Sequence, residues 1–377
     1  MKQKIGFIYL KTGAGHIAGA KALSSKLTDL YPDEVECCLK DGFDKGAWFL
    51  KFFFEKGLSV STNYFELGFV AFYQLYTLKP MLAFLKKIIA PYAVPNLVEF
   101  LRSNQITKLV CLHHTLIPIC REAINRVNPN ILLISIVTDP FTVHPIWFLE
   151  KNTEFIVFPK KALQEGLSKH NVPASRLHQF PLLLSEKFDT PYPQEQIISI
   201  KEKLEIPKDK KIVLIVGGGE GLKNALSIVK AFIKKKSGSF LIVVCGKNRA
   251  LRHSLEYLIQ FSNFKNIKIF GFVSFIPDLM NIADCVITKC GASTPMEALS
   301  LRKPVIISTY IRGQELGNML YIKQNKLGWY IPKPNAIVEK IEEIFSDDKY
   351  LEEIRGHIKK MNIRNGLNDI ADFIWNL

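Results

Sequence analysis

Residues 282–318 combine a glycine turn, the start of a helix and a polar loop, a composition that suits the binding of an anion. We expect a buried strand over Asp284–Thr288, a turn over Lys289–Thr294 and a helix from Pro295. The N-terminus of a helix offers unpaired N–H groups and the positive end of its dipole, which stabilise an anion such as a diphosphate. The polar loop Arg312–Asn318 follows the next strand. Both segments should lie at the carboxyl edge of a parallel sheet, where ligands bind.

A second group of polar residues follows predicted strands in the N-terminal half. His16 comes directly after Gly15 in a glycine turn, and Asp139 and His144 follow the apolar strand Ile131–Val137. A histidine and an aspartate at such strand ends could provide a general base and its partner. The structural alternatives are a capping or surface histidine and, for Asp139, a simple Asx turn.

Charge and cysteine content narrow the classes of partner. The formal net charge of +15 favours nucleic acid, an anionic membrane surface or an acidic small molecule. Nucleic acid is the weakest of these, because the basic residues are spread along the chain. Seven cysteines without paired spacing indicate a reduced, cytosolic setting. His113 and His114 lack a third ligand at suitable spacing, so no metal site is predicted.

Strands and helices alternate throughout both halves of the 377 residues. This pattern predicts an α/β protein with two doubly wound, Rossmann-like domains that face each other across a cleft. The Pro-rich, polar stretch Pro181–Pro193 marks the crossing between them. We expect an N-terminal domain over 1–188, with Phe155–Phe158 as its last strand, and a C-terminal domain over 189–360. A final helix within 361–377 would pack back on the first domain.

The segment Ala47–Leu101 is dense in aromatic residues interleaved with lysines. Such a segment fits a position in the membrane interface, and Phe52, Phe53 and Phe54 are its candidate contacts. A helical insertion packed into the core is the alternative. No charge-free apolar stretch is long enough to predict a spanning helix, and the N-terminus reads as a first strand rather than a signal peptide.

Seven motifs, taken in order, resemble the monogalactosyldiacylglycerol synthase and processive diacylglycerol glucosyltransferase family. That family is related to the peptidoglycan lipid-intermediate N-acetylglucosaminyltransferase. The resemblance covers nearly the whole chain and implies a GT-B glycosyltransferase that uses a UDP-sugar and a membrane lipid, without a metal or other cofactor. The motifs are Gly13–His16, Thr138–His144, Gly217–Gly219, Gly271–Val273, Ile287–Gly291, Glu297–Leu299 and Gly313–Asn318.

The resemblance assigns roles by position. Glu297 would hold the ribose hydroxyls of UDP, and Gln314, Glu315 and Asn318 would approach the hexose, with Gly313 shaping their loop. Phe272 and Val273 would lie against the uracil. On the acceptor side, His16 and Asp139 are the candidates for catalysis, with Gly15 and His144 beside them. The groups expected around the diphosphate are Gly217, Gly218, Gly219, Lys289, Gly291, Ala292, Ser293 and Arg312.

Several of these residues have a second interpretation. Thr294 and Glu297 have the spacing of a capping box, which would turn the Glu297 carboxylate away from a ribose. Gln314 and Asn318 could be loop-capping amides. Leu316 stands where the family commonly has Glu, which leaves the identity of the hexose open.

The predicted function is an inverting transfer of galactose or glucose from UDP to diacylglycerol or a similar lipid alcohol. The expected partners are a UDP-hexose, a lipid acceptor and an anionic membrane surface, at the cytoplasmic face of the cell membrane. A UDP-sugar epimerase of the same fold and a catalytically silent UDP-sugar-binding membrane protein are the alternatives.

Overall fold

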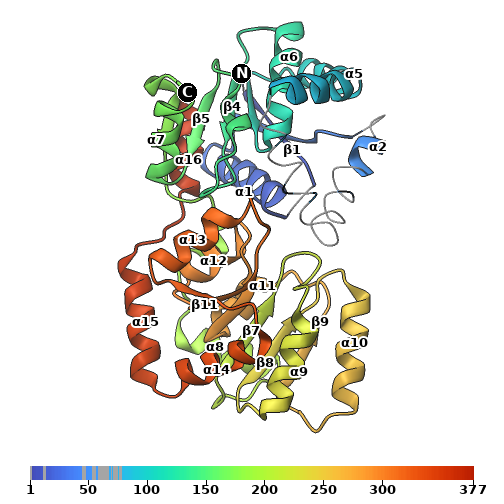
Figure 1. Ribbon diagram of the computed structural model, residues 1–377. Helices are drawn as coiled ribbons and strands as arrows, with labels where there is room; N and C mark the ends of the chain where they lie inside the picture. Colours follow the sequence, from blue (N-terminus) through green and yellow to red (C-terminus); the bar gives the residue numbers. More distant parts are fainter. Residues whose placement is uncertain are drawn as a thin grey trace. The chain divides into compact units, whose positions relative to one another are not determined.

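The computed structural model describes residues 2–11, 14–44, 48–52, 57, 68, 70, 75 and 79–377. The chain divides into two compact units, each built on its own six-stranded parallel sheet (Figure 1). The first unit comprises Met1–Ser185, Ile311–Gly317 and Asn365–Leu377, and the second comprises Glu186–Tyr310 and Asn318–Arg364. The predicted α/β class, with a doubly wound sheet in each half, is confirmed.

The sheet of the first unit has the strand order β2-β1-β3-β4-β5-β6. Its central strands are mostly apolar, as expected for parallel strands that are covered on both faces, whereas its two edge strands carry polar side chains. They are β1 Gln3–Tyr9, β2 Val35–Asp41, β3 Lys108–Cys111, β4 Leu132–Ile136, β5 Glu154–Val157 and β6 Leu177–Gln179. The helices are α1 Ala14–Leu30, α2 Trp48–Lys51, α5 Lys79–Ser103, α6 Ile117–Val127, α7 Lys160–Ser168 and α16 Leu367–Asn376. Short 3₁₀ turns are η2 His114–Leu116, η3 Pro145–Phe148 and η4 Ala174–Arg176.

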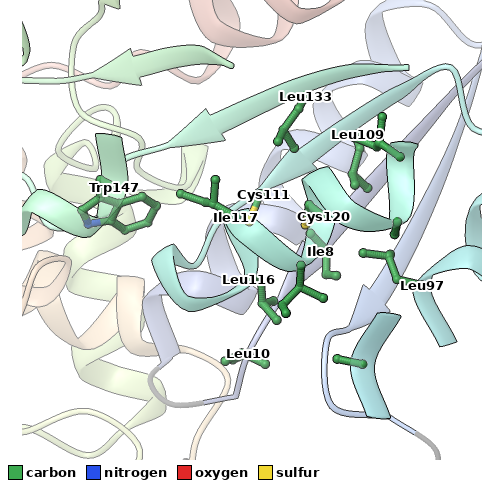
Figure 2. Packing of buried hydrophobic residues seen from close by; sticks show 14 of the residues in the cluster. Ile8, Leu10, Leu97, Leu109, Cys111, Leu116, Ile117, Cys120, Leu133 and Trp147 are labelled. Atoms are coloured by element: carbon green, nitrogen blue, oxygen red, sulfur yellow. The ribbon is translucent and has the colours of Figure 1, made fainter. Parts of the chain in front are cut away.

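Among the described residues of this unit, two hydrophobic clusters pack against the sheet. One includes side chains of α5 and α6, and Figure 2 shows Leu97 of α5 with Leu116, Ile117 and Cys120 in this cluster. Trp147 of η3 is fully buried in the same core. The other core holds α1 and α16. The last helix of the chain therefore belongs to the first unit.

The C-terminal helix is anchored by a buried lysine of β3. The Lys108 Nζ atom donates to the carbonyl oxygens of Ile374 at 2.8 Å and Trp375 at 2.7 Å. These carbonyls lie in the last turn of α16, where a helix has no backbone partners of its own.

The second unit has the strand order β12-β11-β10-β7-β8-β9. Its strands are β7 Ile212–Val216, β8 Phe240–Val244, β9 Ile267–Phe270, β10 Cys285–Lys289, β11 Val305–Thr309 and β12 Gly328–Tyr330. The helical elements are η5 Glu186–Phe188, α8 Gln194–Lys203, α9 Ala225–Lys235, α10 Arg249–Gln260, α11 Ile276–Ile282, α12 Thr294–Ser300, α13 Leu316–Gln324, α14 Pro334–Phe345 and α15 Asp348–Lys360.

The prediction that Phe155–Phe158 is the last strand of the N-terminal half is wrong. The three-residue strand β6 follows it and pairs with β5 at the edge of the sheet. Strand β12 is equally short and lies at an edge of the second sheet. Three residues carry too little hydrophobic periodicity to indicate a strand by themselves. Whether such a segment forms a strand therefore depends on the neighbouring strand with which it pairs.

Helix α5 departs from the expectation about membrane-spanning segments. Its residues Pro80–Ser103 are long and apolar enough to cross a membrane, judged by length and composition alone. Ile89, Val94 and Leu97 of this helix are nevertheless buried in the first unit's core. One face of α5 thus belongs to the fold, and the opposite face is left for contact with the surroundings.

Candidate active site

His16 lies in the first turns of α1, beside the loop that follows β3. Its Nδ1 atom is 2.8 Å from the carbonyl oxygen of Leu112 and 3.0 Å from the Thr138 hydroxyl. Because a carbonyl oxygen only accepts, Nδ1 carries the hydrogen. The neutral imidazole therefore has its lone pair on Nε2, which is the atom that could act as a base.

Burial and a nearby carboxylate shift the pKa of His16 in opposite directions. Burial lowers its pKa from the ordinary 6.5, and the negative charge of Asp139 works against that shift. With the pKa on the low side, the ring is neutral at pH 7. The histidine is then ready to accept a proton, and the neighbouring carboxylate stabilises the imidazolium that results.

Asp139 is buried, and both of its carboxylate oxygens are engaged. The indole Nε1 of Trp147 donates to Oδ2 at 3.1 Å, and Nε2 of Gln314 lies 3.4 Å from Oδ1. Burial raises the pKa of this carboxyl, while the charge of His16 and these donors lower it. A carboxylate held in this way is positioned to orient and to stabilise a charge, and less suited to collect a proton from a substrate.

Three further histidines continue from His16 as a row of neighbouring rings. Ring centroids are 4.8 Å apart for His16 and His113, 4.7 Å for His113 and His114, and 5.9 Å for His114 and His144. Burial and mutual repulsion hold the pKa of His113 and His114 well below 6.5. These rings are therefore neutral at physiological pH.

Two rings of this row cap the short 3₁₀ turns. The Nδ1 atom of His113 accepts the Thr115 N–H at 3.3 Å, and that of His144 accepts the Ile146 N–H at 3.2 Å. His144 thus fixes η3, which carries Trp147 to Asp139. Within the described part of the chain, no three acidic, histidine or cysteine side chains are grouped so as to hold a metal ion.

The loop Ile311–Gly317 clusters with the first unit. The buried carboxylate of Glu315 accepts the Ile311 N–H at 2.8 Å and so stabilises the loop from within. Gly313 has φ +86°, a backbone conformation that glycine adopts without strain. Gly313 thus shapes this loop, and Gln314 extends from it to Asp139.

Gly317 ends the loop against the segment that follows Asp139. Its N–H donates to the Thr142 hydroxyl at 2.6 Å. A Cβ atom at this position would lie 2.0 Å from the carbonyl oxygen of Phe141. Glycine is required for this close approach.

In the second unit, Glu297 lies on α12 without a hydrogen-bond partner among the described residues. The capping box allowed by the sequence is not formed, because the helix begins at Thr294 and the N-cap residue is Ser293, whose side chain makes no capping hydrogen bond. Burial alone raises the pKa of Glu297 to about 7. A carboxylate that the fold leaves unsatisfied is available to a ligand.

Asn318 connects α13 to the turn that precedes α12. Its Nδ2 donates to the carbonyl of Cys290 at 3.1 Å. The opposite atom, Oδ1, is buried and has no partner within the described ranges. An orphan acceptor beside Gly291 is a second group that a bound molecule could satisfy. Lys289, at the end of β10, and Ala292 are half-buried in the same turn.

The glycines after β7 play different parts. A Cβ atom on Gly217 would lie 2.4 Å from the backbone of Gly221, so this residue serves the tight turn. Gly218 has φ +78°, and a Cβ atom on Gly218 or Gly219 would meet nothing within 4 Å. The backbone of these two residues borders open space, as a phosphate-binding turn requires.

An exposed aromatic ring follows β9. The side chain of Phe272 is 67% exposed, with the Lys247 Nζ atom 5.9 Å from the ring centroid. Val273 beside it is half-buried. A large exposed ring is suited to stacking on a planar base. Sequence reasoning missed Lys247, which carries no motif and is brought to the ring by the turn after β8.

The remaining predicted residues are placed as follows. Gly15 is half-buried beside His16, Phe52 is exposed, and Arg312 is exposed on its loop. Gly13, Phe53 and Phe54 lie outside the described residues. Sequence reasoning also missed the contacts of the Leu112 carbonyl and the Thr138 hydroxyl with His16, which join distant parts of the chain, and the contact of Trp147 with Asp139.

Comparison with known families matches the two halves separately and in order. The family described as "Monogalactosyldiacylglycerol (MGDG) synthase" matches residues 16–181, and "Glycosyl transferases group 1" matches residues 196–361. Monogalactosyldiacylglycerol synthase 2, chloroplastic, of Arabidopsis thaliana is 27% identical over 89% of this chain and 72% of its own. The processive diacylglycerol beta-glucosyltransferase of Bacillus cereus (strain B4264) is 27% identical over 96% of this chain and 90% of its own.

Solved structures agree on the fold. MurG of Acinetobacter baumannii superposes with a TM-score of 0.64 at 11% identity, covering 100% of both chains. A UDP-GlcNAc 2-epimerase from Neisseria meningitidis, bound to UDP-GlcNAc, gives 0.61 at 14% identity over 100% of this chain and 99% of its own. Both carry two Rossmann-like domains, which is the GT-B fold. With its two halves matched in order and these relatives aligned along most of its length, the chain is similar to the monogalactosyldiacylglycerol synthases and the processive diacylglycerol glucosyltransferases.

Proposed function

We propose that the protein transfers galactose or glucose from UDP to the hydroxyl of diacylglycerol or a similar lipid alcohol, with inversion at the anomeric carbon. The observation that carries the proposal is the geometry of His16, whose Nδ1 is tied to the Leu112 carbonyl so that Nε2 is the basic atom. The names of the relatives support a diacylglycerol acceptor.

In the proposed reaction the first unit activates the acceptor. Nε2 of His16 removes the proton of the lipid hydroxyl as its oxygen attacks the anomeric carbon. The bond between that carbon and the diphosphate oxygen breaks, and its electron pair leaves with UDP. Asp139, held by Trp147 and Gln314, stabilises the imidazolium. This assigns the base role to His16 and an orienting, electrostatic role to Asp139.

The second unit is assigned to the nucleotide sugar. Glu297 accepts hydrogen bonds from the ribose hydroxyls, and the exposed ring of Phe272 stacks on the uracil. The backbone of Gly218, Gly219 and Gly291–Ser293 faces the diphosphate, where N–H groups and a helix N-terminus stabilise negative charge. No metal or other cofactor enters this scheme.

The hexose is assigned chiefly to Asn318, through its orphan Oδ1. The predicted contacts of Gln314 and Glu315 with the hexose are less direct. The amide of Gln314 reaches Asp139, and the carboxylate of Glu315 is used inside its loop. We therefore assign these two residues to positioning.

Membrane binding is assigned to the outer face of α5. Phe84, Ile88 and Tyr92 are spaced by four residues, so they lie on one face of the helix, and their side chains are 60%, 38% and 45% exposed. An apolar stripe with lysines beside it binds at an anionic membrane surface. The cytoplasmic face is the expected location, because UDP-sugars are supplied there.

The purified protein should be incubated with radiolabelled UDP-galactose or UDP-glucose and diacylglycerol in anionic vesicles, with and without EDTA. A chloroform-soluble labelled glycolipid is expected with one of the two donors, with equal yield in EDTA. If no pairing gives a glycolipid, the transferase proposal is wrong. Loss of product in EDTA with recovery on adding a divalent cation would contradict the metal-free scheme.

The same assay separates the alternatives. An epimerase would interconvert UDP-sugars without any acceptor, and several solved structures of this fold are epimerases. A silent binding protein would retain UDP-sugar in equilibrium dialysis without turnover. The names of the sequence relatives favour the transferase.

A further inference from the structure

An apolar cavity lies in the first unit between α5 and the elements that carry the histidine row. Its volume is about 150 Å³. Leu82, Leu85 and Ile89 of α5 line one side, with Ile119 of α6 and Ile146 of η3 opposite them. Its walls are mostly aliphatic, so a hydrocarbon chain that enters it is removed from water.

The cavity shares its wall with the candidate active site. Thr115 and Ile146 both line it, and their backbone N–H groups are the ones that donate to His113 and His144. The ring of His113 in turn lies against His16, with the ring centroids 4.8 Å apart. The residues that wall the cavity thus contact the histidine row, which includes the proposed base.

The cavity is open to solvent at one edge. Ala83 and Leu149 line the cavity and are exposed to solvent. Lys86 also lines it, and its Nζ atom lies 3.3 Å from a carboxylate oxygen of Glu122.

We propose that this cavity binds one acyl chain of the lipid acceptor, taking up about six of its carbon atoms, while the lipid hydroxyl is presented to His16. The inference rests on the proposed function, because it names the acceptor of that reaction as the occupant. It assigns recognition of the lipid's apolar part to α5, η3 and α6, and recognition of the hydroxyl to the histidine row.

The first test fills the cavity from its rim. Ala83→Phe places a ring in the opening and alters no buried contact, because Ala83 is exposed on α5. The KM for a long-chain diacylglycerol should rise about tenfold, because several methylenes lose their burial. The KM for the UDP-sugar and the KM for diacetylglycerol, whose chains are too short to fill the cavity, should not change.

Leu167→Phe is the matched control, since it adds a ring at an exposed position of α7 in the same unit, outside both the cavity and the stripe. Its KM for every acceptor should equal that of the parent protein. If Ala83→Phe leaves the long-chain KM unchanged, or raises the diacetylglycerol KM equally, the cavity does not hold an acyl chain.

A second test needs no turnover. Diacylglycerol with a photoreactive diazirine on one acyl chain is irradiated with the full-length protein, and cross-linked peptides are identified by mass spectrometry. We expect adducts within residues 82–89 and 118–119, with protection by unlabelled diacylglycerol. Adducts elsewhere, or equal protection by phosphatidylcholine with the same chains, would overturn the assignment to the acceptor.

The two proposals fail in different ways. Glycolipid synthesis with adducts outside the cavity leaves the transferase intact and removes the acyl-chain site. Adducts in the cavity without glycolipid from any donor support the binding site and remove the transferase.

Discussion

The Nδ1 atom of His16 lies 2.8 Å from the carbonyl oxygen of Leu112, which follows the strand next to the one that leads into His16. This contact joins residues 96 positions apart and fixes the tautomer of the ring. The basic nitrogen is consequently Nε2. The chemistry proposed for the protein depends on this orientation more than on any other contact in the first unit.

Replacing His16 should remove the base and leave donor binding intact. We expect His16→Ala to lower kcat by about 100-fold or more, the usual contribution of a general base. The affinity for UDP, measured by calorimetry, should stay the same because the donor residues are in the second unit. A kcat within a few-fold of the parent value would assign the base elsewhere.

The pH profile should report on the pair formed by His16 and Asp139. Burial lowers the pKa of His16 from 6.5, so kcat/KM should stay constant from pH 8 to below 6.5 and fall only at lower pH, as the base becomes protonated. Asp139→Asn removes the charge that raises this pKa. The acidic limb of the kcat/KM profile should then shift to lower pH by about one unit, because that is the usual effect on a pKa of losing a close opposite charge. An unmoved limb would mean that Asp139 does not act electrostatically on the base.

The ionised Glu297 carboxylate should lower the free energy of unfolding while it strengthens the binding of UDP. Its pKa is raised to about 7, so its ionisation opposes folding increasingly as the pH rises from about 4.5 and fully above 7. Glu297→Gln should therefore unfold at higher denaturant concentration than the parent at pH 8, by roughly 1–2 kcal/mol after allowance for its partial exposure. At pH 4 the two proteins should be equally stable.

The same Glu297→Gln protein should bind UDP more weakly, by about tenfold, because an amide oxygen accepts less strongly from ribose hydroxyls than a carboxylate. Calorimetry with UDP and with uracil separates the contributions, since uracil lacks the ribose. Equal weakening for both ligands would place Glu297 away from the ribose.

Replacing Asn318 should impair use of the UDP-hexose far more than it lowers the stability of the fold. Asn318→Ala removes one hydrogen bond to the Cys290 carbonyl but also an orphan buried acceptor, so stability should change by only about 1 kcal/mol. The kcat/KM for the UDP-hexose should drop by about tenfold or more. A large loss of stability with unchanged kinetics would make Asn318 a structural amide.

The outer stripe of α5 should carry membrane affinity. Replacing Phe84, Ile88 and Tyr92 together by Ser should reduce sedimentation with anionic vesicles by about tenfold or more, since the apolar area that enters the interface is lost. Tyr257 of α10 and Phe261, which directly follows that helix, are even more exposed, at 67% and 71%, and their double Ser variant is the control. Equal loss in both variants would indicate unspecific hydrophobic binding.

The α/β class, both parallel sheets and the positions of most helices follow from the sequence, because apolar runs and glycine turns are local signals. The family resemblance predicted the donor residues from local motifs of the same kind. The sequence did not predict the edge strands β6 and β12, because a three-residue segment becomes a strand only through pairing with its neighbour in the sheet. Whether Glu297 forms a capping box with Thr294 could be decided only from the structure, because a capping box depends on the direction of the side chains.

The proposal of His16 rather than Asp139 as the base rests on the tertiary structure. Their protonation depends on the Leu112 carbonyl, Trp147 and Gln314, which lie 96, 8 and 175 residues away from their partners. Hydrogen-bond direction and burial are properties of packed atoms, and no spacing along the chain encodes them. The sequence by itself determined which residues are chemically able to act, and the fold decided which atom of each is free to do so.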